Sequence, residues 1–468
     1  MLAAGLLALS ACGGGGGAAP APSTTAAPVT TASPSTTLPA TTTAPALPAG
    51  SCPAVPARAE PRPDRPRYVV RVDVRPAERS AEGSVEVRFV PDLDTDRLVF
   101  RLWPNGPRQR GEGAGIETGP VEVDGKPAPS RLDVPTTLVV PLAGGLRAGN
   151  AVVARVPWKL VLPLRVRDRI SAEGDAARLG SFFPMLEWEP GVGWATDPPT
   201  TQFAEASTAP TADFDLTVLA PEGLGVLASG TPDRPGHWTA TAMRDVAVAV
   251  GRFTTESAVA HAPGPVTVTV GVHAGMAEAP SVYLRRAVAV IEDFGRRFGP
   301  YPWPTFTVSV TPTLRSGIEY PGHVMQGPGT SGRSLSHEVG HQWFYALVGN
   351  NQARDPWLDE ALATWAEARA DGSLAGYRAR VVPEAVRGRA GEPMSFWDPR
   401  SAQYYLGAYV QGAQALAALG PPELVDCALA TYVAANAHGI ARPRDLVAAT
   451  TTVFPGAAEV LSRYGIRP

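Results

Sequence analysis

The motif His-Glu-x-x-His at residues 337–341 has the residue types and the spacing of a metal-binding catalytic centre. If residues 334–348 form a helix, His337 and His341 lie one turn apart on one face, where both imidazoles can bind the same ion. Glu338 lies about 100° around the helix from His337, so it need not be a ligand. It can instead act as the general base toward a water bound to the metal.

A second acidic residue, Glu360, follows His341 after eighteen residues, near the start of a second predicted helix over residues 356–370. Two His, one Glu and a water form an open tetrahedral zinc site of the catalytic kind, whereas a structural site fills all four positions with protein. The alternative is a surface helix with two unrelated histidines, but the chain has only seven His and two of them have this spacing. We therefore predict one Zn2+ ion per chain and a zinc hydrolase.

The segments before the motif predict a β domain. Between residues 68 and 253, apolar and polar side chains alternate in segment after segment. The clearest segments are Val70-Val72-Val74, Val85-Val87-Phe89 and Leu98-Phe100-Leu102. A period of two predicts antiparallel strands with one half-buried face. We assign residues 61–255 to this domain.

The rest of the chain predicts a mixed domain that carries the motif. A helix is predicted at residues 281–298, and a strand at 306–310 precedes a loop at 314–322. Ala-rich periodic segments predict further helices at 402–419, 423–437 and 443–452. The predicted fold class is therefore an α+β multidomain protein, with residues 256–468 as the catalytic domain.

The first residues predict export and a lipid anchor. Residues 1–11 form an apolar run, too short to span a membrane, that ends in Leu9-Ser10-Ala11 before Cys12. This ending resembles the lipobox of bacterial lipoprotein signal peptides, although no Lys or Arg precedes the apolar run. The resemblance implies that residues 1–11 are removed and that acyl chains on Cys12 anchor the protein. We expect it on the outer face of the bacterial cell membrane, with residues 12–60 as a disordered Gly/Pro/Ser/Thr-rich tether.

Charge and cysteine content limit the remaining partners. Lys and Arg number 41 and Asp and Glu number 44, so there is no basic excess for binding nucleic acid. Besides Cys12, the chain has Cys52 and Cys427, which could form a disulfide or be one exposed and one buried thiol. The oligomeric state is left open, with a monomer slightly favoured.

Residues on both sides of the motif resemble one family. Gly317-Ile318-Glu319-Tyr320-Pro321 precedes the motif, Trp343 follows it, and Trp357-Leu358-Asp359-Glu360-Ala361 contains the third ligand. With the spacing of eighteen residues, they resemble the aminopeptidase N-like family of gluzincin zinc metallopeptidases. The resemblance implies a saddle-shaped β domain followed by a thermolysin-like catalytic domain with a helical lobe. It also implies a zinc-dependent aminopeptidase that acts on the free amino termini of peptides.

The resemblance implies a role for each matched residue. The zinc ligands would be His337, His341 and Glu360, with Glu338 as the general base. Glu319 would contact the amino terminus of the substrate, and the backbone of Gly317 and Ile318 would pair with the bound peptide as an added edge strand. Tyr409 would stabilise the oxyanion, with Tyr405 as the alternative if the register shifts by one turn.

The segment 201–205 departs from the family pattern. Gln202 would contact the substrate in the family manner. Ala204 stands where a second amine-binding group is expected, and Glu205 follows one place later. Glu205 is therefore the candidate for that second contact.

Three residues near the motif have two interpretations each. His323 could line the substrate pocket or be a loop histidine without a role. Asp359 and Glu367 could orient the two ligand histidines or be ordinary solvated charges on a helix.

The predicted function also has alternatives. One is a zinc endopeptidase or another zinc hydrolase, which would not require a free amino terminus. The other is a tethered binding module with an inactive zinc site, although a purely structural site needs neither Glu338 nor Tyr409.

Overall fold

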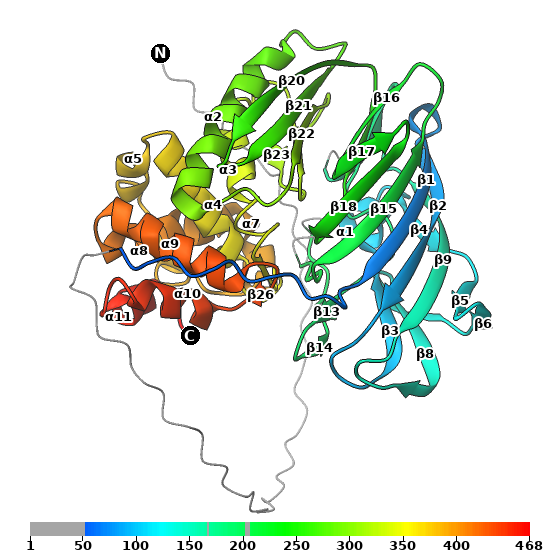
Figure 1. The fold of residues 1–468 in the computed structure, drawn as a ribbon, viewed down its shortest axis with the longest axis horizontal. Helices are drawn as coiled ribbons and strands as arrows, with labels where there is room; N and C mark the ends of the chain where they lie inside the picture. Colours follow the sequence, from blue (N-terminus) through cyan, green and yellow to red (C-terminus); the bar gives the residue numbers. More distant parts are fainter. Residues whose placement is uncertain (1–51, 166–167, 202–205) are drawn as a thin grey trace, which may run out of the picture. The chain divides into compact units, whose positions relative to one another are not determined.

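A computed structural model describes residues 52–165, 168–201 and 206–468. The described residues form one compact unit of mixed α/β structure with several antiparallel sheets (Figure 1). Cys12, most of the predicted tether, Gln202 and Glu205 lie outside the described residues. Among the helices that are described, none combines the length and the apolar character that crossing a membrane requires.

The largest sheet has nine strands and confirms the alternating pattern of the N-terminal half. Its strands, in order across the sheet, are β17 (Thr231–Arg234), β18 (His237–Met243), β15 (Ala212–Leu219), β1 (Arg67–Arg75), β2 (Ser80–Phe89), β9 (Val152–Val161), β5 (Val121–Val123) and β6 (Lys126–Ala128), and β4 (Gly115–Thr118) also pairs with β9. Val70, Val72 and Val74 of β1 are buried, while Arg71 is exposed. One expectation is wrong: β1 and β15 run parallel, so the sheet is mixed rather than antiparallel throughout.

Smaller sheets complete this half of the molecule. The first four-stranded sheet contains β10 (Ile170–Glu173), β11 (Ala176–Leu179), β19 (Val248–Gly251) and β16 (Gly225–Ala228). The second contains β12 (Met185–Leu186), β3 (Thr95–Arg101), β8 (Thr137–Leu146) and β7 (Arg131–Val134), and β13 (Trp188–Glu189) pairs with β14 (Gly193–Trp194).

A five-stranded sheet precedes the motif in the chain. Its order is β20 (Phe253–His261), β21 (Pro265–His273), β22 (Thr305–Val310), β24 (His323–Gln326) and β23 (Gly317–Ile318), so β23 is an edge strand. The helix α2 (Pro280–Phe298) packs along β20 and β21 (Figure 1). The predicted helix and strand at 281–298 and 306–310 are each within one residue of the structure. The predicted loop at 314–322 contains β23, which pairs with β24.

The remaining elements are mainly helical. They include α3 (Arg333–Gly340), α4 (Trp357–Ala370), α5 (Leu374–Arg378), α6 (Met394–Trp397), α7 (Ser401–Tyr404), the π-helix η5 (Tyr405–Val410), α8 (Gln411–Leu419), α9 (Pro422–Asn436), α10 (Pro443–Thr451) and α11 (Ala457–Ser462), with a short parallel pair of β25 (Gly349–Asn350) and β26 (Ile440–Ala441). The helix expected at 402–419 is thus interrupted by a π-helical turn. The helix expected at 334–348 ends at Gly340, because the buried residues after it adopt wider turns in which the N–H of Ala346 bonds to the carbonyl of His341.

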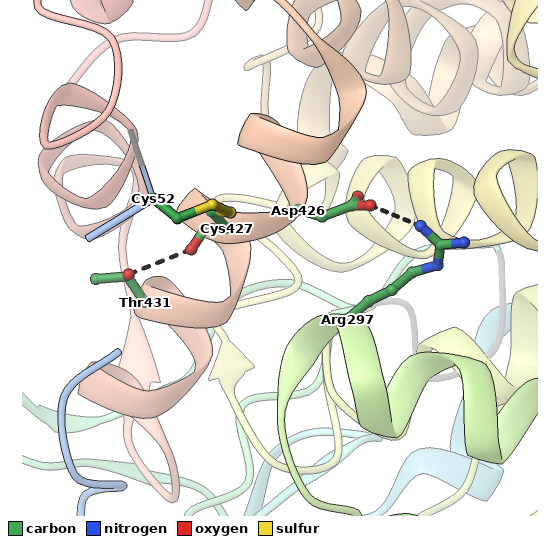
Figure 2. Close-up of a disulfide and its surroundings, with 5 residues drawn as sticks. All are labelled: Cys52, Arg297, Asp426, Cys427 and Thr431. Carbon is green, nitrogen blue, oxygen red and sulfur yellow. Dashed lines mark hydrogen bonds and ion pairs between the residues drawn. A yellow bond between two sulfur atoms is a disulfide. The ribbon is translucent and has the colours of Figure 1, made fainter. Parts of the chain in front are cut away.

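Cys52 and Cys427 form a disulfide, which resolves the alternative left open by the sequence (Figure 2). The bond joins the start of the described chain to α9. Beside it, Asp426 accepts hydrogen bonds from Arg297 of α2 at 2.8 Å and from Arg369 of α4 at 3.0 Å (Figure 2 shows the first). The N-terminal segment is therefore attached to a helix that is itself fixed to α2 and α4 by ion pairs.

Candidate active site

The three predicted zinc ligands converge on one point. The Nε2 atoms of His337 and His341 are 3.2 Å apart, and Oε2 of Glu360 lies 3.1 Å from the first and 3.4 Å from the second. Bonds of 2.0–2.1 Å to a tetrahedral zinc ion place two ligand atoms about 3.3 Å apart. The three donors therefore fit a zinc ion without rearrangement, and they are the group of metal-binding side chains found among the described residues.

Close packing of α3 against α4 brings Glu360 to the two histidines. Gly340, at the end of α3, lies against Ala363 and Ala366 of α4. A Cβ atom added at Gly340 would lie only 3.2 Å from Cβ of Ala366 and 3.3 Å from Cα of Ala363. Small residues on both helices therefore set the helix separation on which the ligand geometry depends.

Each ligand histidine is oriented by a hydrogen bond at its other ring nitrogen. Nδ1 of His337 lies 3.2 Å from Oε2 of Glu367, and Nδ1–H of His341 donates to the carbonyl of Phe344 at 3.1 Å. These bonds leave both Nε2 atoms available to the metal. Glu367 thus has the orienting contact considered from the sequence. Asp359 does not, because its carboxylate accepts from Gln352 and from the backbone N–H of Glu360.

A cation and a tyrosine hold Glu367 in place, and a second tyrosine contacts the cation. Arg333 forms an ion pair with Glu367, whose Oε1 also accepts from the hydroxyl of Tyr377 at 2.7 Å. Arg333 Nη2 donates to the hydroxyl of Tyr405 at 2.5 Å. The motif alone gives no sign of Arg333, although Arg333 stands four residues before His337 and so lies on the same face of α3.

Glu338 projects toward the edge strand β23. A Cβ atom added at Gly317 would lie 2.6 Å from Oε1 of Glu338, so only glycine leaves room for this carboxylate. Burial raises the pKa of Glu338 to about 7, although the neighbouring charges of His337 and His341 lower it. A carboxylate with this environment can accept and return a proton near neutral pH.

The two candidate tyrosines have different surroundings. The ring of Tyr409 stacks on His337, with 5.8 Å between the ring centroids and 11° between the planes. Tyr405, one turn earlier, directs its hydroxyl to Arg333. Both belong to the π-helix η5, and insertions of this kind are frequent at functional sites.

Glu319 is buried next to β23 and forms an ion pair that the sequence did not suggest. Arg169 Nη2 lies 2.9 Å from Oε1 of Glu319, and both side chains are less than one tenth exposed. Burial by itself raises the pKa of Glu319, but the charges of Arg169 and His341 outweigh it and hold this pKa below its usual range. The sequence gives no sign of the pair, since its members stand 150 residues apart.

His323 is part of the core, so neither interpretation of it as a pocket or loop residue is correct. It begins β24 and is fully buried. Its Nδ1–H donates to the carbonyl of Ala247 at 3.1 Å, and its Nε2 accepts from the hydroxyl of Ser309 at 2.8 Å. Burial lowers the pKa of His323 to about 4, so the ring is neutral in the folded protein.

No protein-family model matches the sequence. Among solved structures, the fold is similar to that of the M1 zinc metallopeptidase from Deinococcus radiodurans. The match covers 86% of this chain and 94% of that protein, with 21% identity and a TM-score of 0.65. A mutant two-domain M1 zinc metallopeptidase bound to L-arginine is also similar. This match covers 86% of this chain and 95% of that protein, with 20% identity and a TM-score of 0.65. A third match is a mutant Deinococcus radiodurans M1 zinc metallopeptidase bound to a Tyr-Ser-Ala substrate. The match covers 86% of this chain and 94% of that protein, with 20% identity and a TM-score of 0.61. The chain therefore has the fold of the two-domain M1 zinc metallopeptidases, in agreement with the resemblance found in its motifs.

Proposed function

We propose that the protein is a zinc-dependent metallopeptidase that removes residues from the amino termini of peptides. The observation that carries the proposal is the arrangement of His337, His341 and Glu360, whose donor atoms are spaced as a tetrahedral zinc ion requires. The solved structures of the same fold support it, because their bound molecules are an amino acid in one case and a short peptide substrate in another. The saddle-shaped β domain and the thermolysin-like catalytic domain expected from the sequence belong to the same proposal.

Zinc held by these residues would supply Lewis acidity, which makes water more acidic and polarises a carbonyl group. Glu338 takes the proton of the attacking water and returns it to the leaving amine. Tyr409, which stacks on His337, donates its hydroxyl hydrogen to the oxyanion of the tetrahedral intermediate. Tyr405 is less suited to this role because its hydroxyl contacts Arg333.

Two features position the peptide. The edge strand β23 pairs only with β24 among the described strands, so the backbone of Gly317 and Ile318 can pair with an extended substrate. Glu319 follows directly on this strand and faces the amino group of the first residue. Gln202 and Glu205 remain candidates for further contacts with that residue.

The location of the protein is part of the proposal. Cys12 carries acyl chains, and the part of the predicted tether that precedes Cys52 separates the peptidase from the outer face of the bacterial cell membrane, whereas residues 52–60 belong to the folded unit through the disulfide. Support comes from the lipobox-like ending before Cys12. Mass spectrometry of the mature N-terminus tests this, and Cys12→Ala should release the protein from the membrane fraction.

Product analysis tests the activity. The purified protein is incubated with a panel of aminoacyl amides and with longer peptides, with and without a zinc chelator. Stepwise release of single residues that stops with chelator and returns with zinc supports the proposal. Cleavage only at internal bonds would favour the endopeptidase alternative, and peptide binding without any cleavage would favour an inactive binding module.

A further inference from the structure

The Arg169–Glu319 ion pair connects the β half of the molecule to the substrate-binding carboxylate. Arg169 immediately precedes β10, whereas Glu319 immediately follows β23. The guanidinium nitrogen and the carboxylate oxygen are 2.9 Å apart, and the two side chains are 7% and 8% exposed. A buried charge is tolerated only where it is compensated, so the pair is a fixed part of the site rather than a transient surface contact.

The surroundings of Arg169 limit its freedom to leave. Arg178 of β11 donates to the carbonyl of Asp168 at 2.7 Å and to the carbonyl of Pro312 at 3.2 Å, which fixes the backbone beside Arg169. The guanidinium also lies 5.6 Å from the ring centroid of Tyr320. The cation is therefore held beside Glu319 by the sheet, by the backbone and by an aromatic ring.

This placement changes what a substrate ammonium group experiences. A carboxylate alone attracts the ammonium of a free amino terminus strongly in a buried site. Arg169 contributes a fixed positive charge 2.9 Å from the same carboxylate. Because Coulomb energy is inversely proportional to distance, a cation about twice as far from the ammonium group as the carboxylate is cancels about half of that attraction.

We propose that Arg169 is a specificity-determining residue that weakens the preference of the site for a free amino terminus over an acylated one. This inference rests on the proposed peptidase function and on the proposed role of Glu319. The relevant quantity is the amino-terminal selectivity, defined as kcat/KM for an aminoacyl amide divided by kcat/KM for its N-acetyl derivative.

The test measures this selectivity at one pH in the zinc-loaded full chain and its variants. At a pH at which Glu319 stays ionised, Arg169→Met should raise it about tenfold, mainly through a lower KM for the free-amine substrate, because the opposing charge is gone. Arg169→Lys retains the charge and should stay near the wild-type ratio. Arg65→Met is the matched control, since it breaks the comparable Arg65–Asp213 ion pair and should leave the ratio unchanged.

A second pair of variants avoids the unpaired buried carboxylate that could prevent Arg169→Met from folding. Glu319→Gln should lower the selectivity, and adding Arg169→Met to Glu319→Gln should raise it again severalfold, because the repulsive charge acts whether or not Glu319 is present. If Arg169 only holds Glu319 in place, removing Arg169 from the wild type lowers the selectivity. Removing Arg169 from the Glu319→Gln variant then leaves the selectivity of that variant unchanged. Either of those results overturns the inference.

Failure of the inference differs from failure of the proposed function. A peptidase whose selectivity does not rise when Arg169 is removed contradicts the role of Arg169 but remains a peptidase. Absence of zinc-dependent hydrolysis of both the free and the acetylated substrate contradicts the proposed function itself.

Discussion

The Nδ1 atom of His337 lies 3.2 Å from Oε2 of Glu367, so the first proposed zinc ligand is oriented by a carboxylate two helical turns beyond Glu360, the third proposed ligand. We expect Glu367→Ala to weaken zinc binding by about 10- to 100-fold, because the ring loses the partner that fixes its tautomer and orientation. Competition with a chelator of known affinity measures this. Asp359→Asn is the control, since Asp359 does not contact the histidines. An equal loss in both variants would show that the charge of α4 matters rather than the contact.

Tyr409 and Tyr405 can be distinguished by kinetics. Tyr409→Phe removes the hydroxyl proposed to stabilise the oxyanion, and we expect kcat to fall by about 10²- to 10³-fold with KM nearly unchanged. Tyr405→Phe removes a contact with Arg333, so its kcat should stay within about threefold of the wild-type value. Steady-state kinetics of both variants on one aminoacyl amide distinguishes the two tyrosines. A larger loss of kcat in Tyr405→Phe than in Tyr409→Phe would assign oxyanion stabilisation to Tyr405.

His323 should make the fold sensitive to acid. Burial lowers the pKa of His323 from 6.5 to about 4, so the unfolded chain binds a proton below pH 6.5 that the folded protein does not accept until about pH 4. The free energy of unfolding should therefore fall with decreasing pH across this window, by about 3 kcal/mol in all from this residue.

Urea unfolding of the wild type and of His323→Gln at several pH values between 7 and about 4 measures this effect. The zinc ligands titrate in both proteins and cancel in the comparison. The variant is less stable at pH 7 but should lose less stability on acidification. Parallel pH profiles of the two proteins would contradict a neutral, buried His323.

The disulfide should contribute to stability. Cys427→Ser frees the N-terminal segment from α9, and we expect a loss of about 2–5 kcal/mol, because the unfolded chain gains conformational freedom. Guanidinium unfolding measures the difference. Reductant should lower the stability of the wild type to that of the variant and should leave the variant unchanged. A wild type insensitive to reductant would contradict the bond.

The sequence predicts well what depends on local spacing. The motif and its spacing predict the roles of the two histidines and Glu360. The helical period of the apolar residues predicts the helices that carry them. Glu367 could have been preferred over Asp359, because it lies seven residues after Glu360 and thus on the same face of α4.

What the sequence did not predict depends on tertiary contacts. Arg169 reaches Glu319 across 150 residues, and neither residue has a neighbour in the chain that signals the other. The early end of α3 could not be predicted from the periodicity of apolar residues. Residues 341–348 are all buried, so no polar face indicates where the helical backbone ends. The same holds for η5, whose π-helical turn interrupts a regular Ala-rich pattern.

Elemental analysis of the purified protein tests the central claim most directly. The wild type and Glu338→Ala should each contain about one zinc ion per chain, since Glu338 is not a ligand, and only Glu338→Ala should lack activity. Glu360→Ala loses one of three protein ligands and should retain little zinc after dialysis. A wild type without stoichiometric metal, or a Glu360→Ala variant with a full complement of zinc, would contradict the assigned site.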